Sequence, residues 1–496
     1  MPSRALATVV SLIVAFGGLL AATPAGGAHK QAPLVRLTLK PPRTGTVRAA
    51  HFRWSAKKAR VSCRLVRLRG QSRTPVKRVA FHRCSSPKSW KRLAPARYRF
   101  ELRAVGRAGR RMHLAYGFAV HRATQPPPPP PGPPPPPPPP PSEPPASVFL
   151  SPSGSDGNPC SPALPCVSFD RAYHVAQPGQ VVEVAGGTYG DQDVLADGSK
   201  TSSADVIFRP AAGASVSLGS LEVFGSHLTF RQLTVNGDWQ TYHGTDDVTF
   251  RDVTVHGVIL TQSSSNITVI GGSVGGTVDT KSQFGNWPVG TNNTNIVVDG
   301  VSFHDVTRSG SGVHVECLLV GGTIGFVLRN SRFSNCDVFD VSIGQMNDSA
   351  PPSNITVENN FFGASNGYFS FDINTTTASL SNVLIRNNSS PQQMYLGNAL
   401  PVLSNVRVIA NVAPISASNC EARILYSHNV WQGGACGATD VNAASGFRNP
   451  AANDLHLVAG AAAIDRGDPS GYPATDIDGQ ARPQGARPDA GADEAG

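Results

Sequence analysis

A short apolar triplet recurs along residues 206–408, and polar side chains alternate with apolar ones around it. Successive triplets begin 22, 20, 19, 29, 30, 29, 28 and 23 residues apart. Repeats of this length are typical of solenoids, in which each repeat buries its apolar side against its neighbours. Because the spacing drifts and propeller signatures are missing, the pattern predicts a parallel β-helix with turns of variable length. The triplets begin at Val206, Leu228, Val248, Ile267, Ile296, Phe326, Ile355, Val383 and Val406.

Two further patterns fit a solenoid. Asparagine directly precedes five of the triplets, and stacked asparagines can hydrogen-bond along the axis of such a fold. These residues are Asn266, Asn295, Asn354, Asn382 and Asn405. Before the repeats, Ser168 can cap a short helix whose apolar residues from Phe169 to Ala176 follow helical spacing. We expect this helix to cover the open end of the first coil, which would otherwise expose its core.

The N-terminal part of the chain has a different, two-residue period. Tyr98, Phe100, Leu102 and Ala104 alternate with charged residues, which predicts a β-strand with one face in a core. Together with 50 Gly and 42 Pro among 496 residues, these patterns exclude an all-α protein. The predicted fold class is all-β, with a small β-sandwich followed by a parallel β-helix.

Composition divides the chain into four parts. Residues 1–28 have the apolar stretch and small residues of a secretory signal peptide. Residues 31–123 form the sandwich, 124–146 a linker, and 147–496 the β-helix. Proline occupies 17 of the 20 positions from Pro126 to Pro145, which predicts a semi-rigid polyproline II stalk. No later segment is apolar enough for a membrane span, so we expect a secreted or cell-surface protein with no transmembrane span after cleavage.

The two folded parts carry opposite charge. Residues 29–125 contain 26 Lys and Arg and a single acid, Glu101, whereas the chain after residue 125 contains 16 basic and 32 acidic residues. A basic surface of this size attracts polyanions by counterion release. The predicted partner is an extracellular polysaccharide or a cell-wall polyanion, with no specific nucleic acid. A solvated basic face, or one that docks on the chain's own acidic part, remains the alternative.

Eight cysteines fall into four close pairs, and export permits disulfides to persist. Pairing of nearest neighbours is one of about 105 connectivities, and it keeps each bridge within one part of the chain. None of the pairs has the spacing of a zinc or redox motif. The expected disulfides are Cys63–Cys84, Cys160–Cys166, Cys317–Cys336 and Cys420–Cys436.

Particular segments resemble known families. The Phe52–Ser55 strand, the Cys63 strand and the run from Tyr98 to Gly109 resemble bacterial immunoglobulin-like domains. The capped helix, followed by Val181–Val184 and the triplet repeat, is similar to the pectin-lyase-like superfamily, which implies a right-handed parallel β-helix that binds or processes extracellular polysaccharide. The end of the chain, from Leu455 through Asp476–Gly479 to Glu494, resembles the choice-of-anchor Q segment of bacterial β-helix proteins.

Three acids lie at the centres of similar strand patterns: Glu316, Asp340 and Asp372. If their apolar neighbours point inward, these acids point outward. We therefore expect an exposed ladder on successive coils, close enough to hold Ca²⁺. His314, two residues before Glu316, is the candidate catalytic acid or base.

Two functions stay open. The first is a secreted β-helix protein that binds carbohydrate, since no clear general base accompanies the acids. The alternative is a Ca²⁺-dependent uronate lyase, in which the three acids hold the cation that neutralises the substrate carboxylate. An inverting polygalacturonase is not expected, because Asp246-Asp247 is not followed by the Gly-His-Gly and Arg-x-Lys motifs of those enzymes.

Overall fold

The computed structural model describes residues 34–45, 49–69, 75–106, 109–121, 144–285, 292–310, 312–344, 351–363, 369–373, 379–396 and 402–495. The chain divides into two compact units, Met1–Pro140 and Pro141–Gly496. The predicted signal peptide and all but the last three residues of the predicted linker lie outside the described residues. No helix among the described residues is long and apolar enough to cross a membrane.

The N-terminal unit is a β-sandwich of a three-stranded and a five-stranded sheet, mostly antiparallel. The predicted alternation is confirmed, because Tyr98, Phe100, Leu102 and Ala104 are buried in one core with Phe52. Its first sheet contains β1 (Val35–Leu39), β3 (Ala49–Ala56) and β6 (Lys88–Lys91). Its second contains β2 (Thr44–Gly45), β8 (Arg111–Val120), β7 (Ala96–Gly106), β4 (Ala59–Arg67) and β5 (His82–Arg83).

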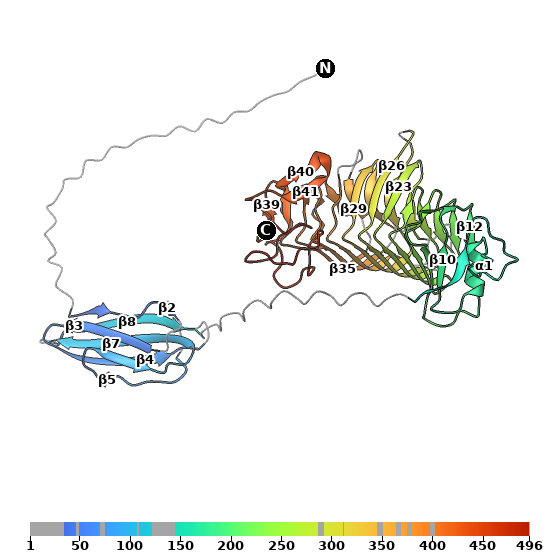
Figure 1. The fold of residues 1–496 in the computed structure, drawn as a ribbon. Helices are drawn as coiled ribbons and strands as arrows, with labels where there is room; N and C mark the ends of the chain where they lie inside the picture. The colour runs from blue at the N-terminus through green and yellow to red at the C-terminus, as the bar shows by residue number, and fades with distance from the viewer. Residues whose placement is uncertain are drawn as a thin grey trace, which may run out of the picture. The chain divides into compact units, whose positions relative to one another are not determined.

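The C-terminal unit is a right-handed parallel β-helix built from three long parallel sheets, as predicted (Figure 1). The twelve-stranded sheet contains β9 (Ala146–Leu150), β10 (Val181–Val184), β13 (Val206–Pro210), β16 (Leu228–Arg231), β19 (Asp246–Arg251), β22 (Ser265–Ile270), β25 (Asn293–Asp299), β28 (Thr323–Arg329), β31 (Ser353–Glu358), β33 (Ser379–Arg386), β35 (Val402–Ile409) and β37 (Leu425–Ser427). The seven-stranded sheet contains β11 (Gly187–Thr188), β14 (Val216–Leu218), β17 (Thr234–Val235), β20 (Thr254–Val255), β23 (Ser273–Val278), β26 (Ser302–Thr307) and β29 (Arg332–Cys336). The nine-stranded sheet contains β12 (Gln192–Val194), β15 (Leu221–Val223), β18 (Trp239–Thr241), β21 (Ile259–Thr261), β24 (Ser282–Phe284), β27 (Glu316–Val320), β30 (Phe339–Ile343), β32 (Phe369–Ile373) and β34 (Met394–Tyr395).

The last coils and the C-terminal segment contain shorter elements, which Figure 1 draws in orange and red. They are β36 (Val412–Pro414), β38 (Val430–Gln432), β39 (Val441–Asn442), β40 (Phe447–Asn449), β41 (Asp454–Leu457) and the 3-10 turns η2 (Ala417–Asn419) and η3 (Pro450–Ala452). Arg482 closes this end, because its guanidinium is fully buried and pairs with Glu494 at 3.1 Å.

All nine apolar triplets lie in the twelve-stranded sheet, and their first residues pair from strand to strand without a register shift. Their apolar side chains form the main core, in which Phe208, Phe230 and Phe250 stack at 5.2 and 5.1 Å between ring centroids. The repeat predicted from the triplets is therefore the coil of the helix itself.

The predicted asparagine ladder is present on the outside of the twelve-stranded sheet. The amide of Asn295 donates to Asn266 at 3.1 Å, and Asn405 and Asn382 donate to the residue of the preceding coil, each at 3.0 Å. Gly325 occupies the same place between Asn295 and Asn354. A second ladder, which the sequence did not suggest, is fully buried and links Asn360, Asn388, Asn411 and Asn429.

The predicted end cap is the helix α1 (Phe169–Val175), with Ser168 as its N-cap accepting a hydrogen bond from the backbone of Arg171. Phe169 stacks on Phe208 with centroids 5.0 Å apart, so the helix covers the first coils as expected. The four disulfides join nearest neighbours, as predicted: Cys63–Cys84, Cys160–Cys166, Cys317–Cys336 and Cys420–Cys436.

Candidate functional site

The three predicted acids lie on adjacent strands of the nine-stranded sheet: Glu316 on β27, Asp340 on β30 and Asp372 on β32. They do not share one register position. Glu316 pairs with Phe339, the residue before Asp340, and Asp372 pairs with Ser342, two residues after Asp340. The similar strand patterns suggested an alignment that the backbone pairing does not have.

The expectation that these acids form an exposed ladder was wrong. Glu316, Asp340 and Asp372 are at most 2% exposed. Every described residue of β27 and β30 is buried. Side chains that point away from the core are therefore still covered in this part of the sheet.

The Glu316 carboxylate lies between a lysine and a histidine. Its Oε2 lies 3.0 Å from Nζ of Lys281, and its Oε1 lies 2.5 Å from Nδ1 of His314. The structure thus brings His314 and Glu316 together, as their spacing implied. The His314 side chain is 61% exposed and packs edge-on against Phe339. His314 can therefore exchange protons with solvent while it remains beside a buried carboxylate.

Burial shifts the other two acids toward their neutral forms. It raises the pKa of Asp372 to about 7, opposed by a hydrogen bond from Ser342 and reinforced by the charge of Glu316. The pKa of Asp340 is also raised by burial, and neither of its carboxylate oxygens has a hydrogen-bond partner. Carboxyl groups of this kind retain a proton at pH values where an exposed aspartate has lost it.

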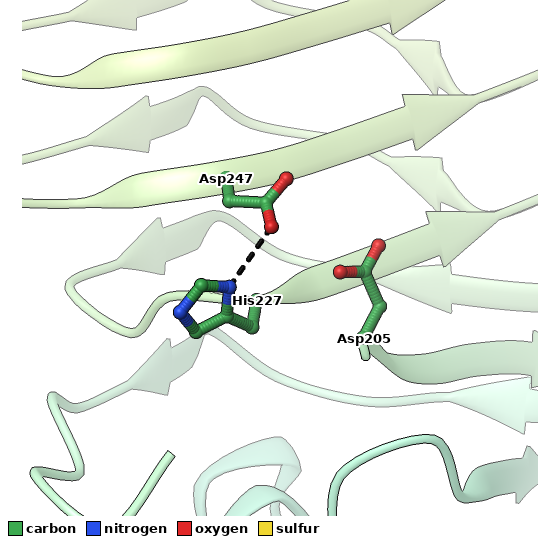
Figure 2. A group of neighbouring side chains, drawn as sticks. All are labelled: Asp205, His227 and Asp247. Carbon is green, nitrogen blue, oxygen red and sulfur yellow. Dashed lines mark hydrogen bonds and ion pairs between the residues drawn. The ribbon is translucent and has the colours of Figure 1, made fainter. Parts of the chain in front are cut away.

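The three acids do not form a metal centre as they stand. Among the described residues, two other groups bring metal-binding atoms within 4.8 Å of one another: Asp205, His227 and Asp247 (Figure 2), and His456, Asp478 and Asp493. Sequence reasoning missed both groups, because their members lie on different coils or in the C-terminal segment. Only the register in which the apolar triplets pair could have indicated the first group, Asp205, His227 and Asp247.

The outward face of the nine-stranded sheet has a continuous row of paired residues. Each member in the C-terminal half lies between two core residues of its strand, as Ser342 does between Val341 and Ile343, so the row faces away from the core. From the N-terminal end, the row consists of Asp193, Glu222, Gln240, Leu260, Gln283, Leu319, Ser342, Asp372 and Tyr395.

Aromatic rings accompany this row at both ends. At the N-terminal end, Phe224 and Tyr242 are half-buried and stack with centroids 4.8 Å apart, and the Tyr242 hydroxyl donates to Gln240. At the other end, Phe369 stacks on Phe339 at 6.2 Å and on Tyr395 at 5.1 Å. Among other aromatic residues of the β-helix, Trp431 is fully buried, and Trp287 and Tyr368 lie outside the described residues.

The fold defines the class: this chain is a right-handed parallel β-helix protein. No family model matches the sequence, and no curated protein matches it. Among solved structures, it is similar to the pectate lyase Pel9A, with 15% identity, a TM-score of 0.42, and coverage of 71% of this chain and 97% of the other. An alginate lyase from a Paenibacillus species has 14% identity and a TM-score of 0.32, with 52% and 97% covered. A rhamnogalacturonan lyase has 14% identity and a TM-score of 0.25, with 57% and 87% covered.

Proposed function

We propose that this is a secreted or cell-surface protein that binds an extracellular polysaccharide along the outward face of its nine-stranded sheet from β12 to β24, where the residues of the outward row are at least partly exposed. The observation that carries the proposal is the pair of stacked rings, Phe224 and Tyr242, beside polar residues of the outward row. Aromatic faces pack against the C–H faces of sugar rings, while carboxylates and amides bind sugar hydroxyls. A parallel sheet repeats both kinds of group from coil to coil, which suits a polymer.

The charge near these rings narrows the class of glycan. Burial raises the pKa of Tyr242, and the nearby carboxylates of Glu222, Asp238 and Asp193 raise it further. A negative environment of this kind repels uronates and accepts neutral or amino sugars. Leu195, which is 50% exposed and directly follows β12, extends the apolar surface. We therefore expect neutral or amino-sugar polymers to bind here more tightly than uronate polymers.

Affinity electrophoresis of the full chain through gels containing neutral, amino-sugar and uronate polymers tests this proposal. Tyr242→Ala is expected to weaken retention by a neutral or amino-sugar polymer by about tenfold, because one buried aromatic contact and its hydroxyl are lost. Val278→Ala is the control, since Val278 is 56% exposed on β23 in a different sheet. Equal retention of both variants and the unaltered protein would exclude binding at Tyr242.

The alternative function is a uronate lyase, and it has its own support. Lys281 and His314 lie 3.0 and 2.5 Å from the Glu316 carboxylate, and burial raises the pKa of Asp372 to about 7, near the value that acid–base catalysis requires. The carboxylates of Glu316, Asp340 and Asp372 are not gathered as Ca²⁺ ligands, so we derive no step through calcium. The same uronate polymers provide the test: ultraviolet absorbance of an unsaturated product that is lost in His314→Ala would favour the lyase.

A second binding function is proposed for the N-terminal sandwich, where the predicted polyanion would bind. Its only acid, Glu101, is buried and already bonded to Arg64 and Arg99, so it leaves the surface charge of the unit strongly positive. Lys57, Lys58 and many arginines are exposed.

Teichoic acid immobilised on a column tests this second function. Retention of the full chain should fall steeply with salt, because each phosphate contact releases counterions. A variant carrying Lys57→Glu and Lys58→Glu should elute at lower salt than one carrying Asp191→Asn, an exposed site on the β-helix. Elution of the unaltered chain without salt would contradict the proposal.

A further inference from the structure

We infer that Asp205, His227 and Asp247 form a site for one divalent transition-metal ion, with Zn²⁺ as its best-matched occupant. The three residues directly precede Val206, Leu228 and Val248, which pair across β13, β16 and β19. They therefore lie one above another on three successive coils, and Figure 2 shows their side chains gathered on one side of the sheet. One metal-binding atom of each lies within 4.8 Å of those of the other two.

The site occupies the ladder position in the three coils that precede the first asparagine of the outer ladder, Asn266. The position that directly precedes the paired strand residue is asparagine in five later coils, and there the amides bond to one another. His227 and Asp247 have the same left-handed backbone as these asparagines, with φ of 57° and 56° against 56° for Asn266. The backbone of the ladder is thus retained, while the amides are replaced by an imidazole and carboxylates.

The contacts among Asp205, His227 and Asp247 place more negative than positive charge in the site. Nδ1 of His227 lies 2.9 Å from Oδ2 of Asp247, and Asp205 receives a hydrogen bond from the Thr229 hydroxyl at 2.5 Å. Two carboxylates therefore face a single imidazole. A divalent cation would neutralise both carboxylates at once.

The donor set selects the class of metal. One imidazole and two carboxylates match the nitrogen and oxygen ligands that Zn²⁺ accepts, whereas Ca²⁺ takes six to eight oxygens. Side-chain exposures of 20% for His227 and 40% for Asp247 leave access for water to complete the coordination. An ion here would also tie together three coils next to the helical cap.

In the second cluster, formed by His456, Asp478 and Asp493, the metal-binding atoms already have hydrogen-bond partners. Both ring nitrogens of His456 are occupied, one by Asp454 at 2.5 Å and the other by Asp478 at 2.7 Å. Asp493 accepts the backbone N–H of Leu457 at 2.7 Å. These bonds join β41 to the C-terminal segment, which accounts for the cluster without a metal ion.

Titration of the full chain, free of any affinity tag, with Zn²⁺ in a calorimeter tests the inference. The decisive variant carries His227→Asn and Asp247→Asn, which continues the asparagine ladder found in later coils and so preserves the fold. We expect the unaltered protein to bind one Zn²⁺ at this site and to melt at a higher temperature in its presence. The variant should bind Zn²⁺ at least about tenfold more weakly and lose the thermal shift.

Two controls test whether zinc binding is specific to this site and to this metal. His456→Asn, in the second cluster, should bind Zn²⁺ as the unaltered protein does, and Ca²⁺ should not compete with Zn²⁺. Circular dichroism without metal checks that the ladder variant is folded. Zinc binding that the ladder variant retains in full, or an unaltered protein that binds no zinc, would overturn the inference.

Discussion

Replacing Arg482 by alanine will destabilise the C-terminal coils by about 3–5 kcal/mol, because it leaves the carboxylate of Glu494 buried without its partner. Arg482 and Glu494 are both fully buried, and their ion pair measures 3.1 Å. The guanidinium also donates to Asn359 at 3.1 Å and to the carbonyl of Gly491 at 3.0 Å. The loss therefore affects the coil at Asn359 as well as the closing segment.

Glu494 explains why the effect is large. Besides Arg482, its carboxylate accepts the backbone N–H groups of Gln484 at 2.8 Å and Asp489 at 2.9 Å. These neutral donors satisfy hydrogen bonds but supply no opposite charge. Without Arg482, the Glu494 carboxylate is buried with no opposite charge beside it, which destabilises the folded state.

Hydrogen exchange measured by mass spectrometry on residues 402–457 would report the destabilisation locally. Unfolding in urea, followed by circular dichroism, would report its effect on the whole β-helix. Arg487→Ala is the matched control, since Arg487 is an exposed arginine in the same segment. If the two variants exchange at the same rate, the buried pair does not stabilise this end of the solenoid.

Replacing Asp372 by asparagine is expected to stabilise the folded protein relative to the unaltered chain as the pH rises from 3.8 to about 7. The pKa of Asp372 is raised by burial from 3.8 to about 7, so the folded state keeps a proton that the unfolded chain loses in this window. For the unaltered protein, this contribution to stability is complete below pH 3.8 and is lost progressively up to about pH 7. Asparagine stays neutral throughout and does not have this loss.

The size of the difference follows from the shift. A change of one pKa unit corresponds to about 1.4 kcal/mol, so the full shift corresponds to about 4 kcal/mol at and above pH 7. Other buried acids, Asp340 among them, also contribute to the pH dependence of the unaltered protein. The difference between variant and unaltered protein, rather than either profile alone, isolates Asp372.

Urea unfolding midpoints measured across this pH window would test the expectation. Asp193→Asn is the control, because Asp193 is exposed on β12 and occupies the same outward row of the same sheet. A stability difference for Asp372→Asn that does not change with pH would show that its carboxyl group titrates as an exposed aspartate does.

The candidate site illustrates how far sequence reasoning reaches. The spacing of His314 and Glu316 correctly indicated that they lie together, because residues only two positions apart along the chain stay close. The arrangement of Glu316 with Asp340 and Asp372 required the pairing between coils, and there the expectation failed. Their burial was also missed, since alternation along a strand identifies which way a side chain points but not what covers it.

The groups that sequence reasoning missed have a common cause. Asp205, His227 and Asp247 are about 20 residues apart, the first two directly before β13 and β16 and the third at the start of β19. Phe224 and Tyr242 likewise directly follow two short strands of different coils. None of these forms a motif along the chain, and their proximity arises only when the coils stack in register.

The amino-acid sequence by itself determined the β-helix, its coils, the asparagine ladder, the helical cap and the four disulfides. Each of these depends on neighbours along the chain or on a pattern repeated in every coil, so local propensity and periodic burial were sufficient. Only the tertiary structure decided which polar and aromatic residues meet. The reason is that successive coils differ in length from 19 to 30 residues, so the turns absorb the difference and spacing alone does not reveal which residues stack.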